Sequence, residues 1–241
     1  IYITGKGRCN ITNACDVEDL FANVMSNKKF LYSAFYGFTN SDVIDFFENH
    51  GIKTKIERGN RVFPVSDHSS DVISALEHAL KEQNVDILLN TCVEKIECAD
   101  SRVIGVVLCG GRKIEADAVI VATGGMSYQA TGSTGDGYRF AEESGHKVTE
   151  CTPSLVPFNA QEEWVAKLQG LSLKNVLVTI YDGRKKLYED FGEMLFTHFG
   201  VSGPLILSAS AAIKQNTIKK PLQMFIDLKP ALSYEALDKR I

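Results

Sequence analysis

The chain has 241 residues, 44% hydrophobic and 23% charged, which is the balance of an ordinary globular protein with one large domain or two small ones. Its formal net charge of -4 gives no overall attraction to nucleic acid or an anionic membrane, and no apolar run approaches the ~20 residues that cross a bilayer. Six scattered cysteines, without a Cys-x-x-Cys pair, zinc spacing or a signal peptide, predict free thiols, no metal site and a cytoplasmic protein.

The first segment, Ile1–Asn13, is dense in glycine and hydrogen-bond donors. Two glycines alternate with Lys6 and Arg8, and Asn10 follows shortly after. Backbone N–H groups, an ammonium and a guanidinium together suit an anion or a polar heterocycle. A solvated turn is the alternative, but the density of donors favours a ligand loop. Cys9 lacks the second cysteine that a dithiol motif would place beside it.

Local patterns then predict helices and one hairpin. Asp16 is expected to cap a first helix, Lys28–Phe38 to be helical, and Thr39 with Asp42 to form the capping box of a third helix. Two extended runs within Ile52–Val65 flank an Arg-Gly-Asn turn and predict a hairpin. Apolar residues at helical spacing predict another helix over residues 72–80. The aromatic residues of these helices are expected to form core.

The pattern next becomes β. Strands are predicted over Asp86–Asn90, Cys92–Cys98, Arg102–Cys109 and Lys113–Ala116. Gly110-Gly111 is a two-residue hairpin signal, so the last three strands should form an antiparallel meander.

The segment from Asp117 to Tyr138 is the centre of the interpretation. Ala118–Ala122 is short, apolar and rich in β-branched residues, which predicts a parallel strand buried on both faces. Thr123-Gly124-Gly125 follows, at the strand end where ligands bind in open α/β sheets. A second group of glycines, between residues 132 and 137, leads into a helix that Ser133 or Thr134 should cap. Such a helix start can hold a phosphate, although a strand, a loop and a helix without ligand fit the spacing equally well.

After Gly145 the composition changes. A proline-containing connection over residues 151–158 precedes a β-rich segment, with strands at Leu173–Tyr181, from Lys185 and at Leu222–Leu228. A helix is expected to end at Ile213, and another to begin at Ser233. His198 lies in a turn rich in glycine and serine, where it could serve as a general acid or simply as a hydrogen-bonded loop residue.

The order of several short motifs carries a family resemblance. They are Thr4-Gly-Lys-Gly-Arg-Cys-Asn-Ile-Thr-Asn13, Arg61-Val-Phe-Pro64, Ala122-Thr-Gly-Gly-Met-Ser127, Thr131-Gly-Ser-Thr-Gly-Asp-Gly137, Pro153-Ser-Leu-Val-Pro157 and Phe196-Thr-His-Phe-Gly-Val-Ser-Gly-Pro204. With these motifs the chain resembles the HI0933-like, or BaiN-type, family of bacterial FAD-dependent oxidoreductases over nearly its whole length. The first Gly-x-Gly-x-x-Gly unit of the family and its last flavin-closing segment have no counterpart in this sequence. The resemblance is therefore to the middle portion of the proteins of that family.

The resemblance implies an α/β fold of three parts. Residues 1–150 would be a partial FAD-binding domain of the two-dinucleotide-binding, Rossmann-like type, with an antiparallel β-meander. Residues 151–232 would be an inserted β-rich domain, and residues 233–241 the start of a small helical subdomain.

The resemblance also implies a set of cofactor-binding residues. They are Lys6, Gly7, Arg8, Cys9 and Asn10 near the flavin and its ribityl chain, Val93 near the adenine, Ala122, Thr123, Gly124 and Gly125 beside the pyrophosphate or adenosine, and Gly135, Asp136 and Gly137 along the helix that borders the flavin. His198, with Ser202 and Gly203, would face the substrate.

The activity implied is hydride transfer between FAD and a small organic substrate, with NADH or NADPH as the reductant. Relatives suggest amines, unsaturated ketones or nucleobases as substrates. Two alternatives remain open: a non-catalytic piece that does not retain FAD, and a nucleic-acid-binding module that uses the Lys6/Arg8 loop and the Lys214–Lys220 stretch. The acidic balance of the chain argues against the second alternative, and the oligomeric state is left open.

Overall fold

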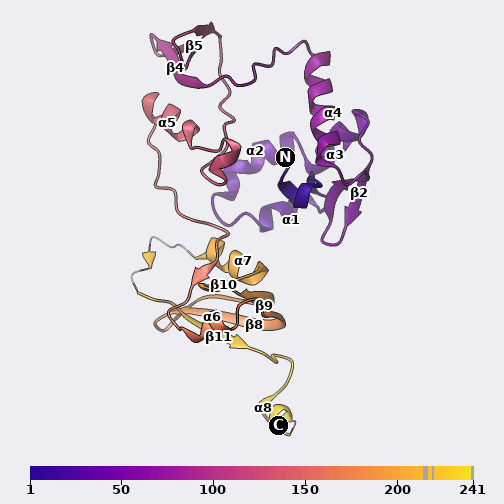
Figure 1. Ribbon diagram of the computed structural model, residues 1–241, viewed down its shortest axis with the longest axis vertical. Coiled ribbons are helices and arrows are strands. Elements are labelled where there is room, and N and C mark those ends of the chain that lie inside the picture. The colour runs from indigo at the N-terminus through magenta and orange to yellow at the C-terminus, as the bar shows by residue number, and fades with distance from the viewer. Residues whose placement is uncertain (214–216, 219, 240–241) are drawn as a thin grey trace. The chain divides into compact units, whose positions relative to one another are not determined.

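The computed structural model describes residues 1–213, 217–218 and 220–239. The chain divides into two compact units, Ile1–Thr149 and Glu150–Ile241, and Figure 1 labels most of their helices and strands. Both units combine helices with antiparallel sheets, so the protein is a mixed α/β protein.

The first unit contains short helices around two small sheets. Its helices and 3-10 turns are η1 (Thr4–Gly7), α1 (Val17–Ala22), η2 (Lys28–Leu31), α2 (Tyr32–Gly37), α3 (Asn40–Asn49), α4 (Ser69–Glu82), η3 (Gln129–Thr131) and α5 (Asp136–Glu143). Its strands are β1 (Thr12–Asn13), β2 (Thr54–Glu57), β3 (Arg61–Pro64), β4 (Val93–Ala99), β5 (Arg102–Leu108) and β6 (Lys113–Glu115). The helices expected from residue 16 to residue 50 and around residue 75 are therefore confirmed.

One sheet of this unit has the order β1-β3-β2 and contains the predicted hairpin. Its central strand β3 is buried, with Val62 and Phe63 almost fully enclosed. Strand β2 pairs with β3 so that Lys55 lies opposite Phe63 and Glu57 opposite Arg61. Because side chains alternate along a strand, Lys55 and Glu57 share one face of the sheet.

The core beside this sheet comes from α3, α4 and the N-terminal loop. The capping box at Thr39 and Asp42 is present, with each residue donating a backbone N–H to the other's side chain. The buried residues of this core are Cys9, Phe47, Val72 and Ala75. The expectation that the aromatic residues form core holds for Phe21 and Phe47. It is wrong for four others, which are exposed: Phe30, Tyr32, Tyr36 and Phe38.

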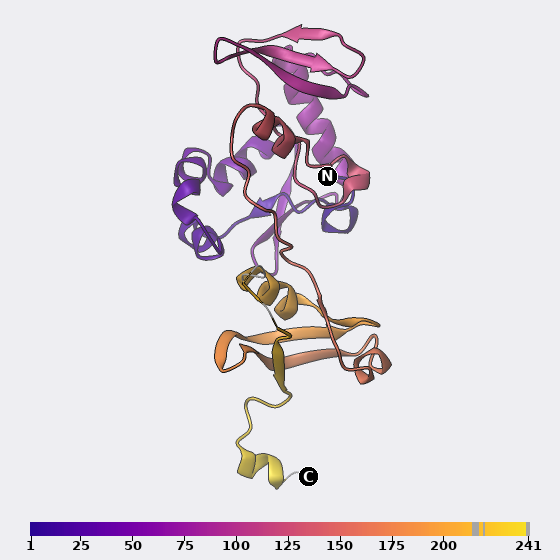
Figure 2. The ribbon, with the colours of Figure 1, turned by 90° about the vertical axis from the view of Figure 1, so that its left-hand side faces the viewer.

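The second sheet of the unit is the predicted meander, with the order β4-β5-β6. Figure 2 shows its three strands side by side. Gly105 in β5 approaches β6 so closely that a Cβ built on it would lie 2.1 Å from the carbonyl oxygen of Ile114. Only glycine fits this position, so the glycine sets how closely the two strands can pair.

Two predicted strands are wrong. Residues 118–122 and 86–90 form neither helix nor strand, and the side chains of Ile120 and Leu89 are 92% and 78% exposed. A strand of a parallel sheet exists only where neighbours take up its backbone hydrogen bonds. Among the residues that the structure describes, no strand lies beside either segment. Apolar composition alone therefore does not make a strand.

The start of α5 also differs from the prediction. The helix begins at Asp136 after Gly135, rather than after Ser133 or Thr134. Gly132 and Gly135 have φ values of 96° and 87°, in the left-handed region that interrupts a right-handed helix. The helix can begin only after the second of these glycines. Its predicted end at Gly145 is close to the observed one, since Ser144 is its C-cap.

The second unit is built on one antiparallel sheet with the order β11-β8-β9-β10-β7. Its strands are β7 (Phe158–Asn159), β8 (Ser172–Asp182), β9 (Lys185–Phe196), β10 (Gly200–Ser202) and β11 (Gln223–Asp227). Its helices are α6 (Trp164–Lys167), α7 (Pro204–Ala212) and α8 (Tyr234–Asp238). The predicted hairpin at Asp182-Gly183, the strand near residue 225 and the helix after Ser233 are confirmed.

The core of this unit lies between the sheet and α7. Figure 2 shows α7 along one face of the sheet, and the helix contacts β9 and β10. Val178 and Ile180 from β8, Met194 from β9 and Ile206 from α7 are almost fully enclosed. This apolar layer is the largest buried cluster in the chain and holds the unit together without any metal or disulfide in the described residues.

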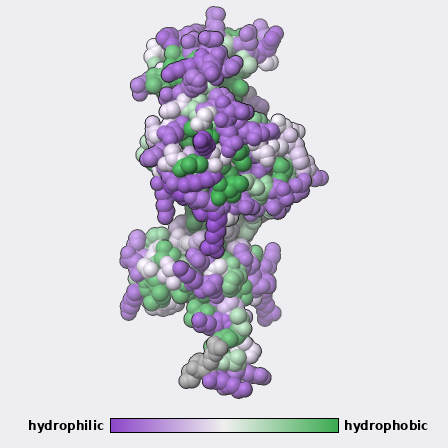
Figure 3. All heavy atoms as spheres, turned by 90° about the vertical axis from the view of Figure 1, so that its right-hand side faces the viewer, coloured by the Kyte–Doolittle hydropathy of each residue, from purple (hydrophilic) through white to green (hydrophobic). Residues whose placement is uncertain are grey.

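Figure 3 shows mostly hydrophilic residues over one face, with apolar residues in small groups. Within the part of the chain that the structure describes, each helix is too short or too polar to span a bilayer.

Candidate functional site

The N-terminal loop is tightly folded. Gly5, Lys6, Gly7 and Cys9 all have positive φ values, between 56° and 84°, a conformation that side chains other than glycine rarely adopt. A Cβ on Gly5 would lie 2.8 Å from the backbone nitrogen of Asn10. Backbone strain of this kind gathers at ligand-binding loops, where surrounding contacts hold it in place.

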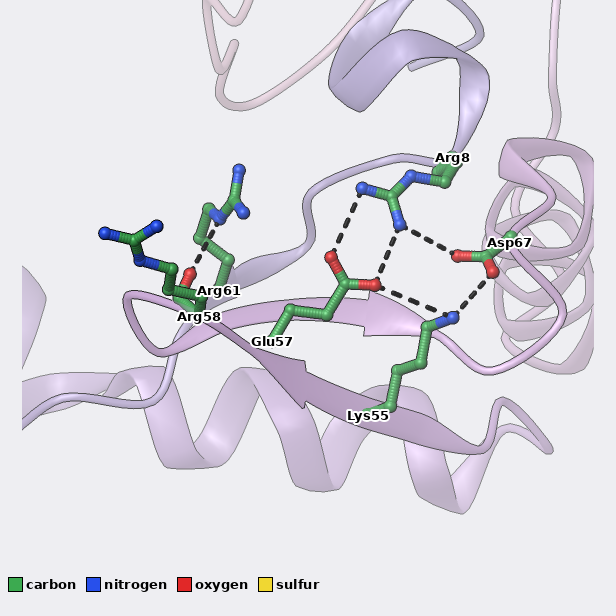
Figure 4. A network of polar contacts seen from close by, with 6 residues as sticks. All are labelled: Arg8, Lys55, Glu57, Arg58, Arg61 and Asp67. Atoms are coloured by element: carbon green, nitrogen blue, oxygen red, sulfur yellow. Dashed lines mark hydrogen bonds and ion pairs between the residues drawn. The ribbon is translucent and has the colours of Figure 1, made fainter. Parts of the chain in front are cut away.

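Arg8 is the residue that holds this loop to the first sheet. Its guanidinium donates to both carboxylate oxygens of Glu57, at 2.8 and 3.3 Å, and to Asp67 at 3.2 Å. Lys55 donates to Asp67 at 2.6 Å and lies 3.7 Å from Glu57. The guanidinium carbon also lies 4.0 Å from the centre of the Phe63 ring. Figure 4 shows this network of two cations and two carboxylates above the β2–β3 hairpin.

The network shifts the titration of its members. The hydrogen bond from Arg8 lowers the pKa of Glu57, and the hydrogen bond from Lys55 lowers the pKa of Asp67. The bond to Glu57 in turn raises the pKa of Arg8. Because each charge of Arg8 and Lys55 is matched by a carboxylate, Arg8 positions the loop rather than presenting a free cation to a ligand.

The other residues of the loop have different surroundings. Lys6 is exposed and makes no ion pair with any residue that the structure describes, so its ammonium is available to an anion. Cys9 is buried in the core with Phe47, which argues against a redox role for its thiol. Asn10, with its amide oriented to satisfy its neighbours, donates to the carbonyl oxygens of Val62 and Thr12.

The two glycine-rich segments after the meander pack against each other. A Cβ on Gly137 would lie 2.9 Å from Thr123 Oγ1, and one on Gly124 would lie 3.0 Å from Ser133 Oγ. Gly135, with φ 87°, faces Met126 in the same way, at 3.2 Å. We call this contact between Val121–Met126 and Ser133–Tyr138 the glycine seam.

The glycine seam leaves backbone open to solvent. Ala122, Thr123 and Gly124 are exposed, and Gly125 is half-buried. The seam ends at the first turn of α5, where Asp136 accepts a hydrogen bond from Thr134 at 2.9 Å. Exposed peptide groups beside a helix start are the usual setting for a nucleotide.

Arg139 joins α5 to the meander. Its guanidinium donates to the backbone oxygen of Glu94 at 2.6 Å, and it also bonds Glu143 at 3.0 Å and Asp136 at 3.4 Å. The bond to Glu143, and after it the bond to Asp136, raises the pKa of Arg139. Glu94 follows Val93, the half-buried first residue of β4. One arginine therefore holds the start of α5 close to the residue expected near adenine.

The structure thus brings three of the four predicted segments together: Val93, Ala122–Gly125 and Gly135–Gly137. The fourth segment, Lys6–Asn10, packs instead on β3 and the core beside it. Three surface cavities border residues 27–30, residues 97–117, and the strands and α6 of the second unit. These cavities are lined by neither the N-terminal loop nor the glycine seam.

His198 lies in the second unit, in the exposed turn between β9 and β10. Its ring meets that of Phe199 edge to face at 4.9 Å between centres. The turn itself is held by Thr197, whose hydroxyl accepts from the backbone of Gly200 at 3.1 Å. Ser202 ends β10, and Gly203, with a φ of 95°, lies between β10 and α7. The arrangement leaves the imidazole exposed to solvent.

The second predicted nucleic-acid contact, Lys214–Lys220, falls partly outside the described residues, which omit 214–216 and 219. The first predicted contact, the Lys6/Arg8 loop, is a weaker candidate because Arg8 is paired with Glu57 and Asp67.

Sequence reasoning missed three residues that shape the site. Glu57 and Asp67 pair with Arg8, and Arg139 anchors α5. The hairpin prediction offered a signal for Glu57, since alternation puts it on one face with Lys55. The spacing of Asp136, Arg139 and Glu143 at three and four residues offered a signal for the helical ion pairs.

Several known proteins are similar to this chain in sequence. A 3-dehydro-bile acid delta(4,6)-reductase from Clostridium scindens is 30% identical over 240 residues, 99% of this chain and 57% of the relative. A ribosomal RNA dihydrouridine synthase from Haemophilus influenzae is 32% identical over 87% of this chain and 51% of the relative. The corresponding synthase from Escherichia coli is 29% identical over 88% of this chain and 51% of its own length.

The chain spans about half the length of the curated relatives it matches. The family described as "HI0933-like protein Rossmann domain" matches residues 1–216. Since that is most of the chain, the protein belongs to the HI0933-like family.

Proposed function

We propose that this chain is part of an FAD-dependent oxidoreductase that transfers a hydride between the flavin and a small organic substrate, with NADH or NADPH as reductant. The glycine seam is the observation that carries the proposal. It pairs a bare Thr-Gly-Gly backbone with the glycine-flanked start of α5, and Arg139 of that helix bonds Glu94 near the start of the meander. A dinucleotide needs such bare backbone because its pyrophosphate must approach peptide N–H groups closely.

The residues present fit the parts of FAD. Gly124 and Gly125 offer peptide groups to the pyrophosphate, and the Val93 backbone offers hydrogen bonds to adenine. The carboxylate of Asp136 is an acceptor, so it suits hydroxyl groups of a ribose or ribityl chain better than a phosphate. The unpaired ammonium of Lys6 would balance negative charge on a phosphate or on the reduced ring.

Bound FAD would supply the ring that accepts and releases the hydride. The protein residues would bind the cofactor, orient it and stabilise its negative charge. Arg8 fixes the loop that carries Lys6, through the Glu57 and Asp67 contacts. His198, accessible in its turn, would hold a proton for transfer to the substrate.

The substrate class follows from the chemistry that the relatives' names share. One is named as a reductase of a delta(4,6) bile acid and the others as synthases of dihydrouridine. Both names describe adding hydrogen to an unsaturated ring. We therefore propose the reduction of a ring carbon–carbon double bond next to a carbonyl group as the reaction of the whole protein.

Anaerobic flavin reduction tests this proposal. The complete gene product, loaded with FAD, should lose its absorbance near ~450 nm on addition of NADH or NADPH. A substrate should then restore the absorbance, and the panel should hold a steroid dienone, free uridine and uridine-containing ribosomal RNA. Restoration by one of the three identifies the substrate class. Flavin that neither nicotinamide reduces, or that no unsaturated ring reoxidises, contradicts the proposal.

One observation favours a second candidate, a piece that does not retain FAD by itself. Ala118–Ala122 leads into the glycine seam, yet Ile120 is 92% exposed and Val121 44% exposed. A site whose supporting segment lacks packing is held less firmly. Titration of the 241-residue chain with FAD separates the candidates: saturable binding supports a retained site, and no binding supports the second candidate.

A further inference from the structure

Cys92 and Cys109 face each other at the open end of the β4–β5 hairpin. Val93 pairs with Leu108 in the register of the two strands. One position further out, the backbone N–H of Cys109 donates to the carbonyl oxygen of Cys92 at 2.9 Å. On the same side of the sheet, the two Sγ atoms are 2.6 Å apart. Both cysteines are free thiols and both are exposed.

This geometry is close to that of a disulfide. Directly opposed residues in an antiparallel sheet have Cα atoms about 4.5–5.5 Å apart, within the range that a disulfide spans. The two sulfurs need to approach only slightly to reach the S–S bond length of about 2.05 Å. Pairing between β4 and β5 holds the backbone of Cys92, and the Gly110-Gly111 turn holds that of Cys109, so bond formation requires no rearrangement of the fold.

We propose that Cys92 and Cys109 are a redox modification site, which peroxides oxidise to an intramolecular disulfide and thiols reduce again. The bond would close the outer end of the meander, immediately beside Val93. It requires neither FAD nor a nicotinamide, so it stands independently of the proposed function.

The reaction balances in two steps. Hydrogen peroxide takes two electrons from the first thiol, whose sulfur becomes a sulfenic acid while one water leaves. The second thiol then attacks that sulfur, forms the S–S bond and releases a second water. Reduction reverses the result by thiol–disulfide exchange with an added dithiol, which is itself oxidised.

The surroundings of the two sulfurs favour one order of events. The Cys109 thiol donates its hydrogen bond to Cys92, and this bond, with partial desolvation and the nearby charge of Glu94, raises the pKa of Cys109. The raised pKa disfavours the Cys109 thiolate, so Cys92 is the sulfur that attacks the peroxide first, and Cys109 is the one that resolves the sulfenic acid.

The other cysteines provide contrasts within the same chain. Cys9 is buried, and Cys15 is half-buried. Cys98 lies on β4, exposed like Cys92, but its partner on β5 is Val103. Cys98 therefore has the exposure of the pair without a facing thiol, and serves as the matched control.

The test is a thiol count with peptide mapping on the 241-residue chain. The reduced chain is treated with roughly equimolar hydrogen peroxide, its remaining thiols are alkylated, and its peptides are analysed by mass spectrometry. We expect a loss of two thiols per chain, a cross-linked peptide containing Cys92 and Cys109, and recovery of both thiols with dithiothreitol. Cys98→Ser should behave like the unchanged protein, whereas Cys92→Ser and Cys109→Ser should not form the cross-linked peptide.

Three results would overturn the proposal. They are a pair of thiols at 92 and 109 that both remain alkylatable, a disulfide that joins two chains, and a cross-link that persists in Cys92→Ser. Circular dichroism of each variant checks that the exposed substitutions leave the fold unchanged.

Discussion

Gly137 lies so close to Thr123 that a methyl group added to it would stand 2.9 Å from Thr123 Oγ1 and 3.3 Å from the side chain of Val121. The start of α5 can therefore pack against the Thr-Gly-Gly turn only because residue 137 has no side chain. This contact is the part of the glycine seam that a single substitution can open, and so it is the place to probe the proposed nucleotide site.

The first prediction concerns Gly137→Ala. Alanine favours a helix over glycine by about 1 kcal/mol, so α5 itself should not be lost. The added methyl should instead push α5 and Thr123 apart and weaken FAD binding by at least roughly tenfold, as isothermal titration would measure.

Gly37→Ala is the matched control for that variant. Gly37 ends α2, and a Cβ there would meet no atom within 4 Å. Its FAD affinity should equal that of the unchanged protein. Equal affinity in the Gly137 variant as well would show that the seam does not border the cofactor.

The second prediction concerns the free cation of the N-terminal loop. Lys6→Gln should weaken FAD binding by roughly three- to tenfold and flatten its dependence on salt, because one charge-assisted contact is lost. Lys81→Gln, a substitution of another exposed lysine in the same unit, should change neither quantity. If the two variants behave alike in a salt series of FAD titrations, Lys6 does not contact the cofactor.

The third prediction uses the lowered pKa values of Glu57 and Asp67. Arg8→Met should lower the Tm by a few degrees at neutral pH, a modest loss because solvent screens these partly exposed groups. Carboxylates with lowered pKa values stabilise the fold above their unfolded pKa of about 4, and this stability is lost as the pH falls through the folded values.

The Tm difference between Arg8→Met and the unchanged protein should therefore shrink below about pH 4. Arg58→Met provides the control, since Arg58 lies on the same hairpin and, among the described residues, makes no ion pair (Figure 4). A difference that stays constant from neutral pH into acid would mean that Arg8 acts by packing on Phe63 alone.

The fourth prediction concerns the core of the second unit. Ile206 on α7 is fully buried against the sheet, so Ile206→Ala should cost about 2–5 kcal/mol in the free energy of unfolding. Leu228→Ala, at a position 57% exposed, should change it by less than about 0.5 kcal/mol. Urea denaturation measures both. Similar losses in the two variants would show that α7 does not complete this core.

Local signals in the sequence were sufficient for part of the fold. The capping box at Thr39, the hairpin turns near Asn60 and Gly110, and the helix start at Ser233 depend on residues a few positions apart, and each is confirmed. The apolar run Ala118–Ala122 shows what local signals cannot predict. Whether such a run becomes a strand depends on neighbours distant in sequence, and composition carries no information about them.

The candidate site divides in the same way. The glycines that form the seam could be found from the sequence, because their positions mark turns and close approaches. The Arg8 network and the facing pair of Cys92 and Cys109 depend on strand register, which joins residues tens of positions apart. The meander prediction named both strands, and counting outward from the turn at Asp100-Ser101 would have placed the two thiols opposite each other.

The FAD content of the purified complete gene product tests the central claim most directly. Denaturation of the protein should release about one FAD per chain, since a flavoprotein retains its cofactor through purification. Gly37→Ala should release the same amount and Gly137→Ala clearly less. A protein that releases no flavin, and that shows no saturable binding when FAD is added back, would contradict the claim.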